Sequence, residues 1–283
     1  MSLSSVRYGH FRHDGHRLEY TEHGSGDRWV VLIHGQLMPR TMHEPLARAL
    51  ADAGNHVVTV DLLGHGTSDR PTDPKQYSMS DFARQVVDLL DAVGAERAVI
   101  GGTSLGANVS LEVADLYPER VQGLIAEMPV LDNAVEAGII AFAPLMFISR
   151  FTPFLVDGTR IAASLVPRRL VGFWLGVGLD TLKQYPGPMG AAVHGIFFGR
   201  IAPSSRLRRE ITAPALVVGH PRDPIHPAAD AEMLAQELPN ATFVAARSIA
   251  EWRASPERLT AEAITFLDRC FDESGTVRRV RST

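Results

Sequence analysis

Residues 98–108 of this chain read AVIGGTSLGAN, an apolar and partly β-branched run that meets two glycines and then a helix-forming segment. The spacing Gly102-x-Ser104-x-Gly106 is typical of a sharp corner between a strand and a helix, where glycines allow a close backbone approach. A helix that begins at Leu105 directs free N–H groups and its positive dipole end towards any oxyanion formed on Ser104. The pattern therefore predicts a nucleophilic serine, with a helix-capping serine as the alternative.

The composition of the 283 residues narrows the class of protein. Contents of 45% hydrophobic and 21% charged residues are ordinary for a globular protein. The length of the chain predicts one domain with an insertion. A formal net charge of −4 without a strong basic cluster argues against nucleic-acid binding. The single cysteine, Cys270, excludes an internal disulfide and a thiolate metal cluster, and it favours a reducing compartment. Because residues 1–7 show no apolar signal segment, we expect a cytoplasmic protein. We also expect no metal and no cofactor, and a homodimer stays open.

Strands and helices alternate along the chain on both sides of the corner. An alternating run at residues 17–22 follows the turn-like Asp14-Gly15 and predicts an antiparallel hairpin. Strands are predicted at residues 29–36, 57–60, 98–101, 121–128, 215–219 and 242–246, of which the first two are expected to be buried. Helices are predicted at residues 42–53, 81–93, 105–117, 227–238 and 256–271. Ser80 is the expected N-cap of the second of these helices. The alternation predicts an α/β fold, with a doubly wound and mostly parallel sheet of about eight strands.

The alternation breaks at residues 129–210. An apolar run of about a dozen residues near Pro144 is too short for a membrane span, which needs ~20 residues. We expect a mostly helical cap that divides the core into residues 1–128 and 211–283, with plain core packing as the alternative. The cap side chains expected to line a substrate pocket are Phe142, Met146, Phe173, Trp174 and Phe197.

Four motifs, each at the carboxyl end of a predicted strand, resemble those of the α/β-hydrolase superfamily, and the resemblance covers essentially the whole chain. They are His34-Gly35, Asp61-x-x-Gly64-x-Gly66-x-Ser68, Gly102-x-Ser104-x-Gly106 and Gly219-x-x-x-Asp223. The resemblance implies the fold more strongly than any chemistry, because one fold hosts many functions.

The resemblance also assigns expected roles to single residues. Ser104 matches the nucleophile, and the backbone N–H groups of Leu105 and Gln36 match the oxyanion-hole donors. The side-chain amide of Gln36 is also available to a substrate. Asp223 lies where the family's triad acid often lies, with a turn or capping carboxylate as the alternative. His34 and His65 occupy family positions that are usually structural.

The expected base is missing from its usual place. In this family a histidine follows the last strand, but residues 246–256 read ARSIAEWRASP, with Ile249 near the expected position. Since no histidine follows His226, we expect the usual Ser–acid–His chain order to be excluded. The candidate bases are then His220, His226 and His194, with Glu251 or Asp223 acting directly or through water as a further alternative.

These features predict an enzyme that acts on a hydrophobic ester, thioester or lactone through Ser104 and a non-standard base. Two alternatives stay open: a non-hydrolytic reaction such as a lyase or rearrangement step, and a ligand-binding protein without catalysis. The remaining N-terminal histidines, His10, His13, His16 and His23, are expected at solvated strand edges, because their spacing matches no metal site.

Overall fold

The structure is a computed structural model that describes residues 5–134, 140, 143–144, 147–148 and 151–281, with side chains left out at Arg169 and 273–281. Its centre is an eight-stranded sheet of order β1-β2-β4-β3-β5-β6-β7-β8. The strands are β1 (Val6–His13), β2 (His16–His23), β3 (Trp29–Ile33), β4 (His56–Val60), β5 (Ala98–Thr103), β6 (Val121–Glu127), β7 (Ala215–Gly219) and β8 (Ala241–Ala245). β1 and β2 are antiparallel and all strands from β4 to β8 in this order run parallel. The predicted fold class is confirmed.

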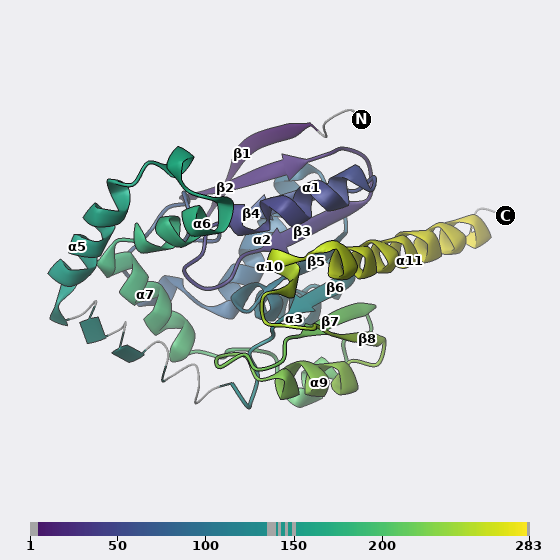
Figure 1. The fold of residues 1–283 in the computed structure, drawn as a ribbon. Helices are drawn as coiled ribbons and strands as arrows, with labels where there is room; N and C mark the ends of the chain where they lie inside the picture. The colour runs from purple at the N-terminus through teal and green to yellow at the C-terminus, as the bar shows by residue number, and fades with distance from the viewer. Residues whose placement is uncertain (1–4, 135–139, 141–142, 145–146, 149–150, 282–283) are drawn as a thin grey trace.

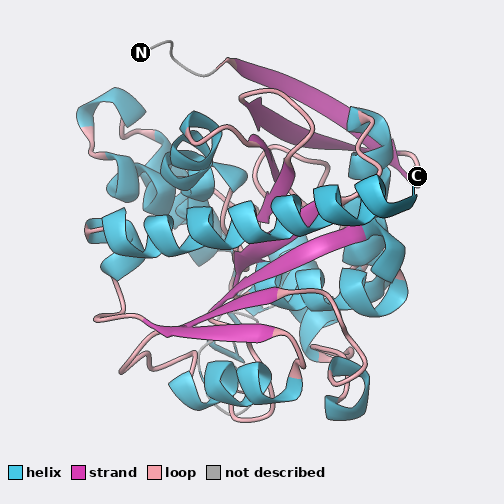
Figure 2. Ribbon diagram, turned by 90° about the vertical axis from the view of Figure 1, so that its right-hand side faces the viewer, coloured by secondary structure: helices cyan, strands magenta, loops and turns pink. Residues whose placement is uncertain are grey.

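Helices cover both faces of the sheet (Figure 1). They are α1 (Glu44–Asp52), α2 (Met79–Val93), α3 (Leu105–Leu116), α5 (Pro153–Ser164), α6 (Phe173–Leu182), α7 (Pro186–Phe197), α8 (Ser205–Arg208), α9 (Ala228–Glu237), α10 (Glu251–Ala254) and α11 (Glu257–Arg281). Short 3₁₀ turns lie at η1 (Arg40–His43), η2 (Pro74–Gln76), η3 (Pro118–Arg120) and η4 (Arg168–Leu170). α1 and α11 pack on one face, and α2, α3 and α9 contact strands from the other. Figure 2 shows α11 lying across the strands.

The central strand β5 shows why the sequence forms this layered core. Successive side chains of a strand point to opposite faces, so Val99 packs into the core under α1 and α11 while Ile100 packs into the core under α2 and α3. Because both faces are covered by helices, a parallel strand of this kind is apolar throughout instead of alternating. The parallel strands then bring their carboxyl ends to one edge of the sheet, where ligands bind in such folds.

The predicted hairpin, strands and main helices are present, with shifted ends. The predicted cap at Ser80 is wrong: Ser78 is the N-cap, and its Oγ accepts the N–H of Asp81 at 3.1 Å. Ser80 lies inside α2, where its hydroxyl donates to Glu112 at 2.9 Å. The short helix α10 between β8 and α11 was not predicted, because Ser255 and Pro256 mark the start of only the longer helix.

The described part of the chain between β6 and β7 contains helices α5 to α8, joined by turns and irregular segments. Helices α5, α6 and α7 lie together beside one end of the sheet (Figure 1). Among the described residues, no helix combines the length and the apolar character needed to cross a membrane. Phe142 and Met146, two of the expected pocket residues, lie outside the described residues. The division into core and cap at residues 129 and 210 stays a prediction.

Candidate active site

Ser104 stands at the corner between β5 and α3 in a strained backbone conformation. Its φ of 56° and ψ of −110° lie where residues other than glycine are rarely found, and such strain gathers at functional sites. The flanking glycines permit the corner to pack against β3. A Cβ at Gly102 would lie 2.3 Å from the carbonyl oxygen of Ile33, and a Cβ at Gly106 would lie 2.1 Å from the same atom. No other residue type fits these two positions without moving the backbone.

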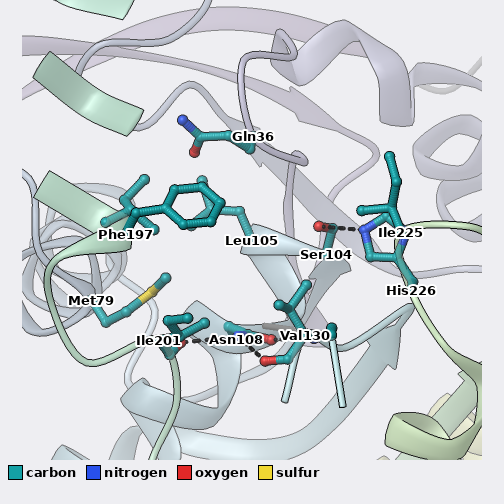
Figure 3. Close-up of a pocket in the computed structure, with 12 residues that line it drawn as sticks. Gln36, Met79, Ser104, Leu105, Asn108, Val130, Phe197, Ile201, Ile225 and His226 are labelled. Atoms are coloured by element: carbon teal, nitrogen blue, oxygen red, sulfur yellow. Dashed lines mark hydrogen bonds between the residues drawn. The ribbon is translucent and has the colours of Figure 1, made fainter. Parts of the chain in front are cut away.

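The hydroxyl of Ser104 meets a histidine from the loop after β7. Its Oγ lies 2.9 Å from Nε2 of His226, and Nδ1 of His226 lies 2.9 Å from Oδ2 of Asp223 (Figure 3). Since the carboxylate only accepts, Nδ1 carries the hydrogen, which leaves Nε2 as an acceptor for the serine hydroxyl. The arrangement has the geometry of a nucleophile, a base and an orienting acid.

Asp223 also shapes the loop that carries the histidine. Its Oδ1 accepts the backbone N–H groups of Ile225 at 2.8 Å and His226 at 3.0 Å, while Oδ2 faces the ring of His226. Burial raises the pKa of Asp223, but the hydrogen bonds from His226 and Ile225 outweigh this effect and leave the pKa below its ordinary value. The carboxylate is therefore held ionised beside the imidazole.

The expectation that the Ser–acid–His chain order is excluded is wrong. Ser104, Asp223 and His226 lie in that order along the chain, and acid and histidine share one turn after β7. The position expected for the base, Ile249, is a half-exposed side chain at 45% exposure. Sequence reasoning tied the histidine to the strand after the acid, and it did not consider that three residues suffice to turn a ring back onto the same carboxylate.

The other candidate bases lie elsewhere. His194 is an exposed residue of α7 whose ring packs on Phe198, with centroids 4.6 Å apart. Glu251 pairs with Arg258 at 2.7 Å, and the hydrogen bonds from Arg258 lower the pKa of Glu251 to about 2. His220 points away from Ser104 into a buried ionic cluster. Of the candidates, the geometry brings only His226 to the serine hydroxyl.

A buried glutamate, Glu127, is hydrogen-bonded to the corner that carries Ser104. Glu127, the last residue of β6, accepts the N–H of Ser104 on its backbone oxygen at 2.9 Å. Its carboxylate accepts the hydroxyl of Thr103 at 2.5 Å and a guanidinium N–H of Arg253 at 2.5 Å, and Arg253 also donates to Thr103 at 3.0 Å. Burial raises the pKa of Glu127, but the charge of Arg253 and the hydrogen bonds from His220 and Arg253 hold it well below its usual range.

His220 completes this cluster. Its Nε2 lies 3.1 Å from Oε1 of Glu127 and its Nδ1 lies 3.0 Å from the carbonyl oxygen of Ser248, so both nitrogens face acceptors. Burial lowers the pKa of His220, but the hydrogen bond and charge of Glu127 outweigh it and raise the pKa above the ordinary value. His220 and Arg253 thus connect the segment after β8, which contains Ser248 and Arg253, to Glu127.

Sequence reasoning missed Glu127, Thr103 and Arg253. Glu127 carried a usable signal, because it is an ionisable residue at the carboxyl end of an otherwise apolar strand, the strand that follows the corner and its helix along the chain. Arg253 carried none, since it is 126 residues away in the chain and lies on a helix that was not predicted.

The oxyanion hole that the resemblance assigns to the backbone N–H groups of Leu105 and Gln36 stays a prediction, and both residues lie beside Ser104. Leu105 is the first residue of α3, so its N–H has no partner inside the helix. Gln36 follows β3, the neighbour of β5, and both residues line the same pocket as Ser104. The positive end of α3 adds to the potential at this point.

The pocket beside Ser104 is almost wholly apolar and has an empty volume of about 540 Å³ (Figure 3). Its lining residues are Gln36, Met79, Ser104, Leu105, Asn108, Val130, Ala134, Ile196, Phe197, Ile201, Ile225 and His226. Phe197 is thus placed as expected. Phe173 and Trp174 do not line this pocket; Trp174 instead donates from its indole to the carbonyl oxygen of Arg253 at 2.9 Å, and Phe173 packs edge-on against it.

His34 and His65 hold loops, as expected. His34 accepts the N–H of Leu62 on Nε2 at 3.1 Å and donates from Nδ1 to Gly35, which ties the ends of β3 and β4 together. Burial lowers the pKa of both histidines, and His65 donates to the carbonyl oxygen of Leu63 at 2.9 Å. Neither ring lines the pocket.

The expectation of solvated N-terminal histidines is wrong for His13 and His23, which are 4% and 1% exposed. His13, Asp14 and Asp81 bring one ligand atom each within 4.8 Å of one another, a spacing that could hold a metal ion. However, Nδ1 of His13 lies 2.6 Å from Asp88 and Nε2 lies 3.4 Å from Asp81, and these hydrogen bonds raise the pKa of His13 despite its burial. A ring whose nitrogens both face carboxylates is protonated more readily, which opposes metal binding.

Comparison with known proteins agrees with this architecture. Residues 28–154 match the family model described as the alpha/beta hydrolase fold. The chain is similar to epoxide hydrolase A of Mycobacterium tuberculosis, at 39% identity over 43% of this chain and 38% of that protein. It is also similar to a haloalkane dehalogenase of Mycolicibacterium paratuberculosis, at 28% identity over 54% of this chain and 51% of that protein. The matched segment therefore spans about half or less of these relatives.

Among solved structures, the enol-lactonase of Burkholderia xenovorans LB400 superposes with a TM-score of 0.75 and 20% identity. The superposition covers 92% of this chain and 99% of the enol-lactonase. At this identity the likeness concerns the fold.

Proposed function

This chain belongs to the α/β-hydrolase superfamily, and from that premise we propose that it is a serine hydrolase of hydrophobic esters, thioesters or lactones. The observation that carries the proposal is the continuous hydrogen-bond chain from Ser104 through His226 to Asp223, with two distances of 2.9 Å. The epoxide hydrolase to which it is similar is named for a hydrolytic reaction, which supports the reaction class.

The geometry supports a two-step acyl transfer. As His226 accepts the hydroxyl proton on Nε2, Oγ of Ser104 attacks the carbonyl carbon, and the negative oxygen faces the N–H groups of Leu105 and Gln36. His226 then gives the proton to the leaving oxygen or sulfur. A water molecule, deprotonated by the same nitrogen, releases the acyl group and restores the serine. Asp223 keeps the ring in the tautomer that both steps need.

The pocket supports an apolar substrate. Apart from the two triad members, its lining side chains are neutral, and most are aliphatic or aromatic. Asn108 is a lining residue, but its amide is taken up by Val130 and the carbonyl oxygen of Ile201. α7 supplies Ile196 and Phe197, which agrees with a role for the helices between β6 and β7 as a cap over the substrate.

The two alternatives make different predictions about the serine. A ligand-binding protein without catalysis does not need the strained Ser104 conformation or a base on its hydroxyl. A non-hydrolytic enzyme in the same pocket would bind carbonyl compounds but would not form a covalent acyl-serine. Both alternatives are therefore separated from a serine hydrolase by covalent labelling and by ester turnover.

The test uses a fluorophosphonate probe and nitrophenyl esters of short and medium acyl chains on the full chain. Wild-type protein should be labelled and should turn over the esters, while Ser104→Ala and His226→Ala should each lose about 10⁶ in turnover. Matched controls are Ser110→Ala, a serine on the same helix whose hydroxyl donates to the carbonyl oxygen of Gly106, and His194→Ala, an exposed histidine. Both controls should keep the activity.

Two results contradict the proposal in different ways. Absence of labelling and of Ser104-dependent turnover would refute a serine hydrolase. Full activity in His226→Ala would refute the assignment of the base, since no other candidate histidine contacts the serine hydroxyl.

A further inference from the structure

The one polar side chain of the pocket without a partner is that of Gln36. Both its Nε2 and its Oε1 are buried and have no hydrogen-bond partner among the described residues. Six other described side chains hold one such unpaired atom each: His23, Thr41, His65, Arg70, Gln76 and Glu112. None of these six lines the pocket beside Ser104, and Gln36 alone in this group has two unpaired atoms.

Among the described side chains that line the pocket, the other polar ones already have hydrogen-bond partners within the protein. The amide of Asn108 is saturated by Val130 and Ile201, and the hydroxyl of Ser104 is bound to His226. Figure 3 shows the amide of Gln36 over Phe197 and Leu105, turned away from the Ser104–His226 pair. An amide turned in this direction is available to a part of a ligand other than the group that meets the serine hydroxyl.

Leaving a buried amide unpaired is unfavourable, so a residue of this kind points to a ligand that pairs with it. A primary amide presents an N–H donor and a carbonyl acceptor side by side. Its full complement is a neutral group with the same two functions, which is a carboxamide or a lactam. A carboxylate would leave Oε1 unpaired and would place a charge in an apolar pocket whose lining contains no lysine or arginine.

We propose that Gln36 is a specificity-determining residue whose side-chain amide pairs with a neutral carboxamide or lactam group of an otherwise apolar substrate. This inference rests on the proposed function for the reaction at Ser104, but the binding it describes needs no catalysis. The backbone N–H of Gln36 and its side chain then serve different ends of one ligand: the oxyanion and the distant amide.

The test measures binding to the Ser104→Ala protein, which cannot turn over. The probes are heptanamide and octan-2-one, which have similar shapes but differ in an NH₂ and a CH₃ group, and ligand-observed NMR gives their dissociation constants. Heptanamide should bind at least tenfold more tightly than octan-2-one, although its NH₂ group is harder to desolvate. Adding Gln36→Met, which keeps the length of the side chain, should abolish or reverse this preference.

The matched control is Gln76→Met in the same background. Gln76 also has a buried, unpaired Oε1, but it does not line the pocket, so its loss should leave the preference unchanged. Equal binding of the two probes, binding of neither, or a preference that survives Gln36→Met would each overturn the inference. If the preference is present but wild-type protein neither labels nor hydrolyses esters, the proposed function fails while the assignment of Gln36 holds.

Discussion

Replacing Glu127 by glutamine should destabilise the fold in a way that depends on pH. The carboxylate is 2% exposed and is shared by Arg253, His220 and Thr103. Glutamine keeps the size of the side chain but removes its charge. Arg253, which is always charged, and His220, which titrates, then lose their shared carboxylate. Breaking a buried ion pair in this way costs about 3–5 kcal/mol. We expect that loss in the free energy of unfolding at pH 6.

The pH dependence follows from His220. In the wild-type protein its folded pKa is raised above the unfolded value near 6.5, so its contribution is fully present below pH 6.5 and is lost as the pH rises through the folded pKa. In Glu127→Gln, burial and the charge of Arg253 lower that pKa, and only the hydrogen bond to the carbonyl oxygen of Ser248 still raises it. Because burial is the largest of these effects, the variant should lose stability as the pH falls. The difference between the two proteins should therefore be larger at pH 6 than at pH 9, and the part due to His220 amounts to about 1.4 kcal/mol per unit of lost shift over the full titration of the ring.

Urea denaturation followed by circular dichroism at pH 6 and pH 9 measures this difference. The matched control is Glu237→Gln, because Glu237 is also buried and pairs with Arg208 at 2.5 Å. The groups that lower its pKa are Arg208, Ser205 and Arg209, none of which titrates between pH 6 and pH 9. That control should destabilise the protein equally at both pH values. A loss below 1 kcal/mol in Glu127→Gln, or the same loss at pH 6 and pH 9, would refute the reasoning.

Three further changes test separate parts of the site. Asp223→Asn keeps an oxygen for the N–H groups of Ile225 and His226 but presents an NH₂ group to the ring of His226. The kcat on nitrophenyl esters should therefore fall about 10⁴-fold with little loss of stability, and a fall below tenfold would contradict the orienting role. Asp230→Ala removes the fully buried carboxylate that accepts N–H groups after β6, and the free energy of unfolding in urea should fall by at least about 3 kcal/mol. Gln36→Met removes two unpaired polar atoms, so the melting temperature without ligand should rise by about 2–4 °C, and a decrease would show that the amide has a partner.

The fold was predictable because its signals are local. Several of the parallel strands are short apolar runs with a glycine or an acidic residue at or directly after the carboxyl end, such as Asp61, Glu127 and Gly219. The corner at Ser104 is fixed by glycines that touch β3. Contacts between distant segments were not predictable. The pair of Glu127 and Arg253 joins a strand end to a helix 126 residues later, and no periodicity marks it. Near misses such as Ser78 and Ser80 arise because both residues can cap, and only the packing of α2 against Glu112 selects between them.

His226, the proposed base, is an intermediate case. The sequence names it as one of three histidines, but the choice depends on the curvature of residues 223–226, which follows from two hydrogen bonds to one carboxylate oxygen. Neither bond can be read from spacing alone.

The turn that carries both Asp223 and His226 has a mechanical consequence. Where acid and base stand on separate loops, each can drift relative to the other, and two distances must be maintained. Here the 2.9 Å contact between them is internal to one turn, so acid and base travel as a single rigid unit. A displacement of the loop changes one coordinate, the separation of Nε2 from the serine oxygen, and a ligand that presses on the neighbouring Ile225 in the pocket acts directly on that coordinate.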